Sequence, residues 1–272
     1  MKVRISGHVV ILVLVVGSLQ IMLAAPESAA KEDLCRDPGP DAIRGTDASD
    51  RIRGTRGDDV IVAGGGDDII FGLGGSDWIC GQGGSDRIYA GGGNTRVWGD
   101  LLFGGPGDDR LFGEAGPDGI LGERGNDVIR GGAGPGTMTG GRGDDRMTGG
   151  SDHDRFYGSR GHDLMVGRDG GDWVLFGDAR RPMVIDLSAG RARGEGRDRL
   201  VGIESVWGSA FADRLIGGFK DNRIVGDWGD DVIHGRGGSD RLDGRAGVDS
   251  LNGGKQRDVC IRGENVVRCQ SS

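Results

Sequence analysis

One apolar side chain recurs at every ninth residue through most of the chain, and glycine and polar residues fill the intervals. This nine-residue repeat extends over residues 45–175 and returns over residues 208–261. A single apolar residue flanked by residues of no fixed type indicates a short strand that directs one side chain inward. The pattern therefore predicts a stack of short strands centred on Ile52, Ile61, Ile70, Ile79, Ile88, Val97, Leu111, Ile120, Ile129, Met138, Met147, Phe156, Met165, Val174, Leu215, Ile224, Ile233, Leu242, Leu251 and Cys260.

Each interval between the apolar positions carries the same turn signal. The full unit reads Gly-Gly-x-Gly-x-Asp-x-aliphatic-x, and Gly140–Thr148 is a nearly complete copy. The sixth position departs from aspartate at Thr95, Gly136 and Asn222. In the remaining copies it is Asp50, Asp59, Asp68, Asp77, Asp86, Asp109, Asp118, Asp127, Asp145, Asp154, Asp163, Asp172, Asp213, Asp231, Asp240, Asp249 and Asp258.

The period also predicts how the strands pair. Glycine permits positive φ and close approach of backbones, so each glycine-rich interval reads as a tight turn. Nine residues then make half a coil, and copy n pairs with copy n+2. The fold class we expect is all-β, a right-handed parallel β-roll, because crossovers between parallel strands are overwhelmingly right-handed.

Two segments interrupt the count. Residues 99–103 read as a five-residue insertion, after which the phase resumes at Gly104. Residues 176–207 form a connector in which Val184 alternates with Asp186 and Ile203 with Ser205. Alternation predicts longer strands, so we expect this connector to continue the stack as wider rungs, with a flexible linker as the alternative. Residues 262–272 are expected to form a C-terminal cap or tail.

The repeat resembles the RTX, or haemolysin-type, calcium-binding repeat family, and the connector resembles the segment that joins two RTX blocks. The resemblance implies several Ca²⁺ ions between stacked turns, held by main-chain carbonyls and by the sixth-position aspartates of copies n and n+2. Sites that depend on Thr95, Gly136 or Asn222 should be weak or absent, and Ala48 and Asp152 put their own turns in doubt. The implied pairs are Asp59 with Asp77, Asp68 with Asp86, Asp109 with Asp127, Asp127 with Asp145, Asp145 with Asp163, Asp154 with Asp172, Asp213 with Asp231, Asp231 with Asp249, and Asp240 with Asp258.

The donor types favour calcium on chemical grounds as well. Carboxylate and carbonyl oxygens select hard cations, and numerous flexible ligands suit calcium better than magnesium. Thiolate and imidazole are missing from the repeat, which disfavours zinc and copper. Burial of one aliphatic side chain per copy contributes less free energy than the ordering of nine residues costs. We therefore expect an expanded metal-free chain that folds on binding extracellular calcium.

The first thirty residues have the features of a secretory signal peptide. Lys2 and Arg4 precede an apolar run from Val9 to Leu23, and small residues follow at 28–30. We expect cleavage near residue 30, secretion to the exterior, and no stable membrane insertion afterwards. A retained signal anchor is the alternative. Residues 31–44 are then a short lead-in to the roll.

Four cysteines remain in such a secreted chain. An even number in an oxidising compartment favours disulfides, so we expect Cys35 to pair with Cys80 and Cys260 with Cys269, near the two ends of the array. Free thiols are the alternative, and a zinc or redox site is disfavoured because no Cys-x-x-Cys occurs.

Composition narrows the functional classes. Glycine accounts for 59 of 272 residues, aromatics for 5%, and the formal net charge is −8. Arginines are interspersed with aspartates rather than clustered, which argues against nucleic acid as a partner. No HExxH or GxSxG motif occurs, and residues 31–44 are too few for a catalytic domain. We therefore expect a non-enzymatic, secreted calcium-binding protein. The alternatives are a calcium-stiffened adhesin or cell-surface structural protein, and a non-catalytic accessory module of an RTX hydrolase; a protein or cell-surface partner is not identified.

Overall fold

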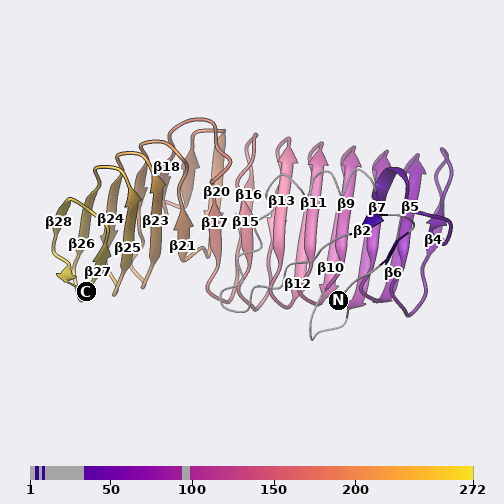
Figure 1. Cartoon of the computed structure of the whole chain (residues 1–272), viewed down its shortest axis with the longest axis horizontal. Helices are drawn as coiled ribbons and strands as arrows, with labels where there is room; N and C mark the ends of the chain where they lie inside the picture. The colour runs from indigo at the N-terminus through magenta and orange to yellow at the C-terminus, as the bar shows by residue number, and fades with distance from the viewer. Residues whose placement is uncertain (1–3, 6–7, 10–33, 94–98, 272) are drawn as a thin grey trace.

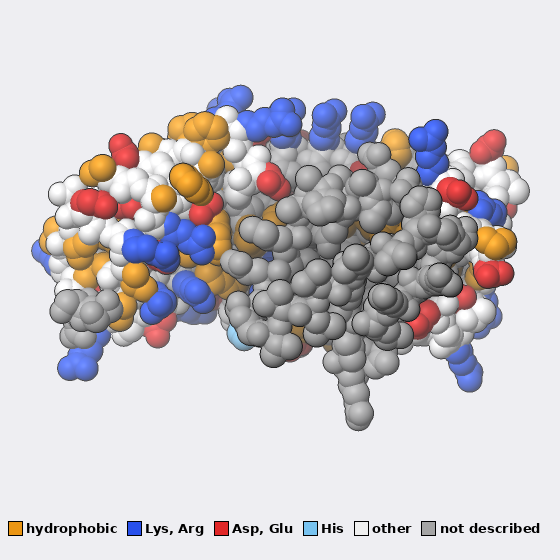
Figure 2. All heavy atoms as spheres, in the orientation of Figure 1, with side chains coloured by type: hydrophobic (Ala, Val, Ile, Leu, Met, Phe, Trp, Pro, Cys, Tyr) orange, Lys and Arg blue, Asp and Glu red, His pale blue; other side chains and the backbone are white. Residues whose placement is uncertain are grey.

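The computed structural model describes residues 4–5, 8–9, 34–93 and 99–271. Two long sheets face each other along the length of the molecule, with the N-terminal coils at one end and the C-terminal coils at the other (Figure 1). Acidic and basic side chains lie side by side on the face drawn in Figure 2, and a group of Lys and Arg gathers toward its C-terminal end. Almost all of the expected signal peptide lies outside the described residues; β1 (Arg4–Ile5) and β2 (His8–Val9) pair antiparallel on their own. No helix among the described residues is long and apolar enough to span a membrane.

Outside the connector, consecutive strands alternate between the two sheets. The 14-stranded sheet has the spatial order β28 (Asn265–Val267), β26 (Ser250–Gly254), β24 (Val232–Arg236), β22 (Arg214–Ile216), β18 (Val184–Asp186), β19 (Arg191–Arg193), β20 (Arg197–Val201), β16 (Leu164–Val166), β14 (Arg146–Thr148), β12 (Val128–Ala133), β10 (Arg110–Ala115), β8 (Arg87–Gly93), β6 (Ile69–Gly75) and β4 (Arg51–Arg53). The 13-stranded sheet has the order β29 (Gln270–Ser271), β27 (Val259–Ile261), β25 (Arg241–Ala246), β23 (Arg223–Trp228), β21 (Ser205–Trp207), β17 (Trp173–Leu175), β15 (Arg155–Tyr157), β13 (Thr137–Arg142), β11 (Gly119–Arg124), β9 (Leu101–Pro106), β7 (Trp78–Gly83), β5 (Val60–Gly65) and β3 (Ile43–Arg44).

The pairing follows the expected n to n+2 register. Leu111 of β10, for example, lies opposite Ile88 of β8 on one side and Ile129 of β12 on the other, and all three strands are parallel. Since consecutive strands belong to opposite sheets, two copies of the repeat complete one coil. The prediction of a parallel β-roll is confirmed.

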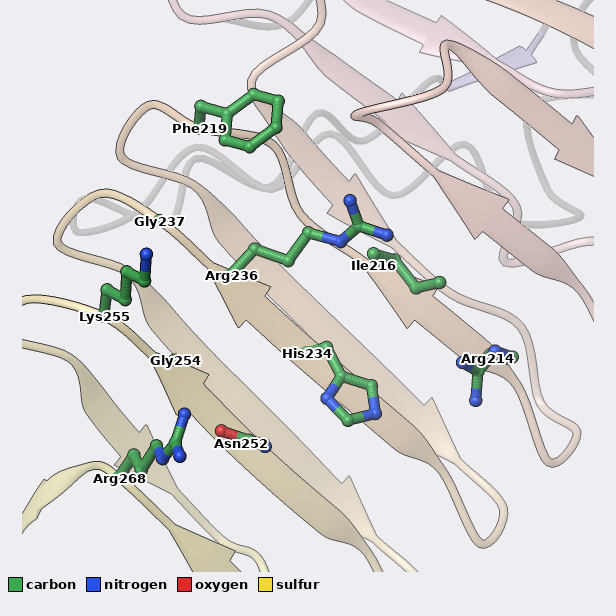
Figure 3. Close-up of a pocket in the computed structure, with 10 residues that line it drawn as sticks. All are labelled: Arg214, Ile216, Phe219, His234, Arg236, Gly237, Asn252, Gly254, Lys255 and Arg268. Atoms are coloured by element: carbon green, nitrogen blue, oxygen red, sulfur yellow. The ribbon is translucent and has the colours of Figure 1, made fainter.

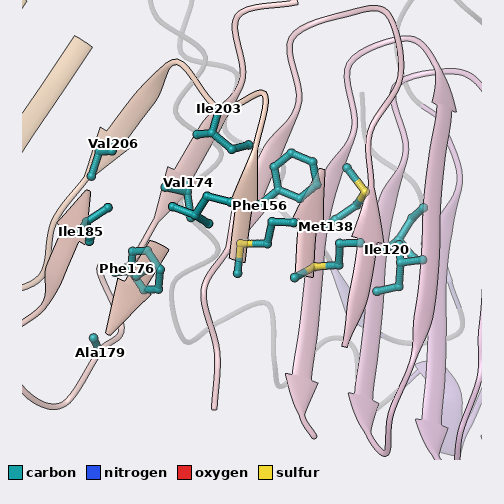
Figure 4. Close-up of a cluster of buried hydrophobic side chains, with 14 of the residues drawn as sticks. Ile120, Met138, Phe156, Val174, Phe176, Ala179, Ile185, Ile203 and Val206 are labelled. Atoms are coloured by element: carbon teal, nitrogen blue, oxygen red, sulfur yellow. The ribbon is translucent and has the colours of Figure 1, made fainter. Parts of the chain in front are cut away.

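The eighth-position side chains fill the space between the sheets. Those of the described copies are fully buried from Ile61 to Leu251, while Ile52 and Cys260 near the two ends retain 7% and 9% exposure. Figure 4 shows Ile120, Met138, Phe156 and Val174 projecting into this single narrow core. Burial of each such side chain contributes roughly 1.5–3 kcal/mol, and the period of nine places one on every half-coil.

The expected insertion at residues 99–103 is wrong. Ile79 of β7 lies opposite Leu102 of β9, and Leu102 is fully buried. Leu102 therefore takes the eighth position and Asp100 takes the sixth, so residues 99–103 belong to the repeat. Thr95 and Val97, assigned to these positions from the sequence, lie outside the described residues. The register of a stacked sheet is fixed by which apolar side chain is buried. The spacing of the glycines alone allows either Val97 or Leu102 at the eighth position, so the sequence could not decide between them.

The connector stays within the stack, but it does not contain the longer strands that we expected. β18, β19 and β21 have three residues each and β20 has five. In one sheet β17 pairs directly with β21. In the other, β19 runs antiparallel between β18 and β20, and Gly190 at φ 61° lies in the reversal between β18 and β19. This extra hairpin widens only one side of the roll. The connector as a whole adds Phe176, Ile185 and Val206 to the core (Figure 4).

Both expected disulfides are present. Cys35 bonds to Cys80 with a Cα–Cα distance of 5.8 Å, which holds the lead-in against the outer face of the 13-stranded sheet. Gln82 Nε2 also donates to the Cys35 carbonyl at 2.8 Å. Cys260 bonds to Cys269, where β28 and β29 add the last rung at the C-terminal end. Each end of the array is therefore closed covalently.

Candidate metal sites along the turns

The sixth-position aspartates line both edges of the roll. Each lies immediately before a strand or, for Asp198, at its second residue, so the turns that enter one sheet form a row along one edge and those that enter the other sheet form a second row. The first row contains Asp50, Asp68, Asp86, Asp109, Asp127, Asp145, Asp163, Asp198, Asp213, Asp231, Asp249 and Glu264. The second contains Asp59, Asp77, Asp100, Asp118, Asp154, Asp172, Glu204, Asp240 and Asp258, with Gly136 and Asn222 at the two positions that lack a carboxylate.

One carboxylate oxygen of each aspartate supports the neighbouring coil. The Asp127 main-chain N–H donates to Asp145 Oδ1 at 2.8 Å, and the Asp145 N–H donates to Asp163 Oδ1 at 3.0 Å. The same contact recurs along both rows at 2.7–3.2 Å. All nine aspartate pairs implied by the resemblance are in this contact; whether each pair holds an ion stays a prediction.

Sequence reasoning missed four acidic residues in these rows. Asp100 Oδ1 accepts the Asp77 N–H at 2.7 Å, and Asp198 Oδ1 accepts the Asp163 N–H at 3.2 Å. Glu204 Oε2 and Glu264 Oε2 accept the N–H groups of Asp172 and Asp249. The segment from Gly194 to Leu200 keeps glycine, glycine, aspartate and leucine at the spacing of the repeat, which was a usable signal for Asp198. The two glutamates replace aspartate at irregular spacing and had none.

The second carboxylate oxygen divides the turns into two kinds. In the open turns, Oδ2 is buried and accepts no hydrogen bond from any described residue. The open turns are those of Asp68, Asp77, Asp86, Asp100, Asp109, Asp118, Asp127, Asp145, Asp172, Asp198, Asp231, Asp240, Asp249 and Asp258. An orphaned buried carboxylate oxygen is costly, so these positions call for a positive partner.

In the capped turns, the side chain at position six is satisfied within its own turn. Asp59 Oδ2 accepts the Thr55 N–H at 2.6 Å, and Asp154 Oδ2 accepts the Gly150 N–H at 2.7 Å. The capped turns are those of Asp50, Asp59, Asp154, Asp163, Asp213 and Asn222, whose partners at position two are Thr46, Thr55, Gly150, Ser159, Ser209 and Gly218.

The backbone at position two decides which kind of turn forms. In every open turn whose position-two residue is described, this residue has positive φ, including non-glycine residues such as Leu73 at 86° and Glu123 at 84°. In the capped turns none of the position-two residues has positive φ. Reversal of this peptide directs the N–H away from the carboxylate. Non-glycine residues rarely adopt such φ values, so the open turns with a non-glycine residue at position two carry local strain that another interaction must offset.

Main-chain oxygens converge on the same space. A Cβ built on Gly113 would lie 2.5 Å from both Asp118 Oδ2 and the carbonyl oxygen of Gly131, two copies further on. Ala63 and Ala90 stand at the equivalent position of two other copies, so a methyl group is accommodated on some rungs. No cluster of three or more His, Cys, Asp or Glu side chains in the described part of the chain could hold a metal. A cation in the open turns must therefore combine carboxylate with main-chain oxygens, a donor set that suits calcium.

Burial makes these carboxylates reluctant to ionise in the absence of a cation. It raises the pKa of Asp109 to about 8 and that of Asp118 and Asp145 to about 7, against a hydrogen bond from the copy two positions earlier that lowers each pKa. Neighbouring carboxylates of the same row raise the pKa values further. A bound divalent ion would remove this cost by favouring the charged form.

Comparison with known proteins agrees with this geometry. The family model of the RTX calcium-binding nonapeptide repeat matches residues 44–79, 71–101, 103–138, 139–174, 207–242 and 225–260. The matches cover well over half of the chain and leave out most of the connector. No curated protein matches the chain. The stacked nonapeptide coils, the two carboxylate rows and the family match together assign this chain to the RTX calcium-binding nonapeptide repeat family.

Proposed function

We propose that this RTX repeat protein is secreted, binds several Ca²⁺ ions along its two rows of turns, folds as it binds them, and has no catalytic domain. The observation that carries the proposal is the set of buried Oδ2 atoms without a partner in the described residues. Two disulfides in one chain are typical of an oxidising compartment, which supports secretion.

The open turns are the proposed ion sites. In them the carboxylate is buried, its Oδ2 lacks a hydrogen bond and a carbonyl oxygen faces the same space. In the capped turns a side-chain oxygen at position six already accepts a hydrogen bond from position two of the same turn, and we place no ion on them. Asp50, Asp59, Asp154, Asp163 and Asp213, expected from the sequence as ligands, therefore act as internal caps in this proposal. Bound calcium would supply positive charge, and the chain would supply the oxygens that surround it.

Folding on binding follows from the cost of closing the roll without ions. Neighbouring carboxylates in one row lie a single rung apart, about 4.8 Å, and those of the open turns are buried away from water. Positive φ at non-glycine residues adds strain to the open turns. Ligands that bind only the folded chain shift the equilibrium toward it, so the free energy of calcium binding becomes free energy of folding.

Calorimetric titration of the chain without residues 1–30 tests the site assignment. Asp231→Asn, in an open turn, is expected to reduce the number of bound ions. Its control is Asp213→Asn, in the adjacent coil of the same row, because Asp213 accepts hydrogen bonds from the Ser209 N–H and hydroxyl. An unchanged ion count in Asp231→Asn, or an equal reduction in both variants, would contradict the assignment.

A further inference from the structure

A groove on the outer face of the 14-stranded sheet adjoins the turns of Asp240 and Asp258, which contribute Arg236, Gly237, Gly254 and Lys255 to its lining. It crosses β22, β24 and β26 near the C-terminal end and has a volume of about 490 Å³. Ile216, which is 8% exposed, lies on its floor, and Phe219, which is 79% exposed, stands at its edge (Figure 3). The groove lies outside the core and is open to solvent.

Basic side chains dominate the lining. Arg214, Arg236, Lys255 and Arg268 all line the groove, although the chain as a whole carries a formal net charge of −8. Figure 3 shows them rising from successive strands and turns on one face of the sheet. Arg236 Nη2 lies 3.7 Å from Asp186 Oδ2 on β18. Within the described residues, the other three cations have no carboxylate within ion-pair distance.

The charges of these cations also affect the pKa of His234, which lines the groove among them. Burial lowers the pKa of His234, and the charges of Arg214 and Arg236 lower it further. An uncompensated group of cations at one place on an acidic protein costs free energy. An anionic ligand would offset this cost, and the lining is therefore suited to an anion.

Two further residues distinguish the chemistry of that anion. Asn252 lines the groove, and its Oδ1 atom is buried and accepts no hydrogen bond from any described residue. The Asn252 side chain as a whole is partly exposed, so a turn of its amide would bring this oxygen into the groove, where a ligand hydroxyl could donate to it and a sulfate or carboxylate group could not. The exposed ring of Phe219 offers an apolar face to the C–H side of a sugar ring. The ligand that fits both features carries hydroxyls and an apolar ring face as well as negative charge.

We propose that this groove binds an anionic saccharide, a chain of sugar units that bear carboxylate or sulfate groups. Arg214, Arg236, Lys255 and Arg268 would contact the anionic groups, Asn252 a hydroxyl, and Phe219 a ring face. A nucleic acid fits less well, because binding of single strands requires several aromatic platforms and the groove has one. The proposal goes beyond calcium binding and does not depend on which turns hold ions.

Titration with defined oligosaccharides tests the proposal, in saturating calcium and with circular dichroism to check that each variant is folded. The probes are an oligogalacturonate, which carries carboxylates, and a heparin-derived hexasaccharide, which carries sulfates; maltohexaose is the neutral control. At least one anionic probe is expected to bind, with affinity that falls as salt rises, while maltohexaose is not. Preference between the two anionic probes identifies the charged group.

Variants locate the site. Arg214→Ala is expected to weaken binding of the anionic probe about tenfold, the usual effect of losing one charged hydrogen bond. Arg110→Ala on β10, at the equivalent repeat position of the same sheet, should leave it unchanged. Phe219→Ala should weaken the oligosaccharide and leave inorganic sulfate unaffected. Failure of both anionic probes to bind, equal losses in Arg214→Ala and Arg110→Ala, or an unchanged affinity in Phe219→Ala would overturn the proposal. Equally tight binding of single-stranded DNA or anionic vesicles would also overturn it. A variant that loses its β signal in calcium would instead count against the folding proposal.

Discussion

Replacement of Asp145 by asparagine separates the ion-binding and structural roles of the turn carboxylates. Asparagine keeps a side-chain oxygen that can accept the Asp127 N–H, which lies 2.8 Å from Asp145 Oδ1 in the native chain. It removes the charge at Oδ2, which is buried without a partner among the described residues. In its row Asp145 stands between the open turn of Asp127 and the capped turn of Asp163, so one substitution is expected to weaken the ion site of its own turn and the neighbouring site of Asp127.

The size of the effect follows from mass action. Extracellular calcium modules bind at roughly 10⁻⁴–10⁻³ M, so one site at 10 mM calcium contributes about 1.4–2.7 kcal/mol to the free energy of unfolding. Loss of one or two sites through Asp145→Asn should therefore cost about 1.4–5 kcal/mol at 10 mM calcium. The cost should shrink as the calcium concentration is lowered.

Asp154→Asn is the matched control. Asp154 is as deeply buried, but its Oδ1 accepts the Gly136 N–H and its Oδ2 accepts the Gly150 N–H, both at 2.7 Å. Asparagine replaces one of these oxygens by an NH2 group, which cannot accept, so this variant should lose one of the two hydrogen bonds, about 1–3 kcal/mol at every calcium concentration. Urea unfolding at 1 and 10 mM calcium, combined with calorimetric ion counts, measures both variants. The reasoning is refuted if the two variants lose the same number of ions or show the same dependence on calcium.

Three further outcomes are expected. Ser209→Ala removes a hydroxyl that donates to Asp213 Oδ1 at 2.8 Å, so urea unfolding should show a loss of about 1 kcal/mol with an unchanged ion count; a lower count would contradict the capped assignment. Gly143→Ala should lower the unfolding free energy by roughly 2–4 kcal/mol, because Gly143 has φ 136° and a Cβ would overlap the Gly125 carbonyl, whereas Gly83→Ala meets nothing within 4 Å and should stay within about 0.5 kcal/mol. In EGTA, the β signal should be stronger at pH 5 than at pH 8.5: burial raises the pKa of Asp109 from 3.8 to about 8, so the folded chain holds more protons than the unfolded chain in this window and loses stability as pH rises through it. A metal-free β signal that grows with pH would contradict this sign.

Most of the fold could be predicted from the nine-residue period of the sequence. An apolar residue such as Ile129 every ninth position, with an aspartate two residues before it, specifies both the core and the carboxylate rows, because each coil repeats the environment of the last. The phase failed near Asp100, in the connector and at Glu264. There the count of residues per coil changes, and burial rather than spacing decides which aspartate enters the row.

The division into open and capped turns was less accessible to sequence reasoning. Thr55 and Ser209 at position two are signals for a cap, since their hydroxyls also bond the turn carboxylate. Gly150 and Gly218 cap in the same way without a hydroxyl. Both of these belong to turns without glycine at position four, as do the turns that contain Ala48 and Phe211. The choice depends on the backbone of the whole turn, which no single position determines.

The most direct test of the account is a calcium titration of the chain from residue 31 onward, in which far-ultraviolet circular dichroism measures the β signal at each calcium concentration. The account expects little β signal in EGTA at neutral pH and a cooperative rise as calcium passes through roughly 10⁻⁴–10⁻³ M. A complete β spectrum in excess EGTA, unchanged when calcium is added, would contradict it.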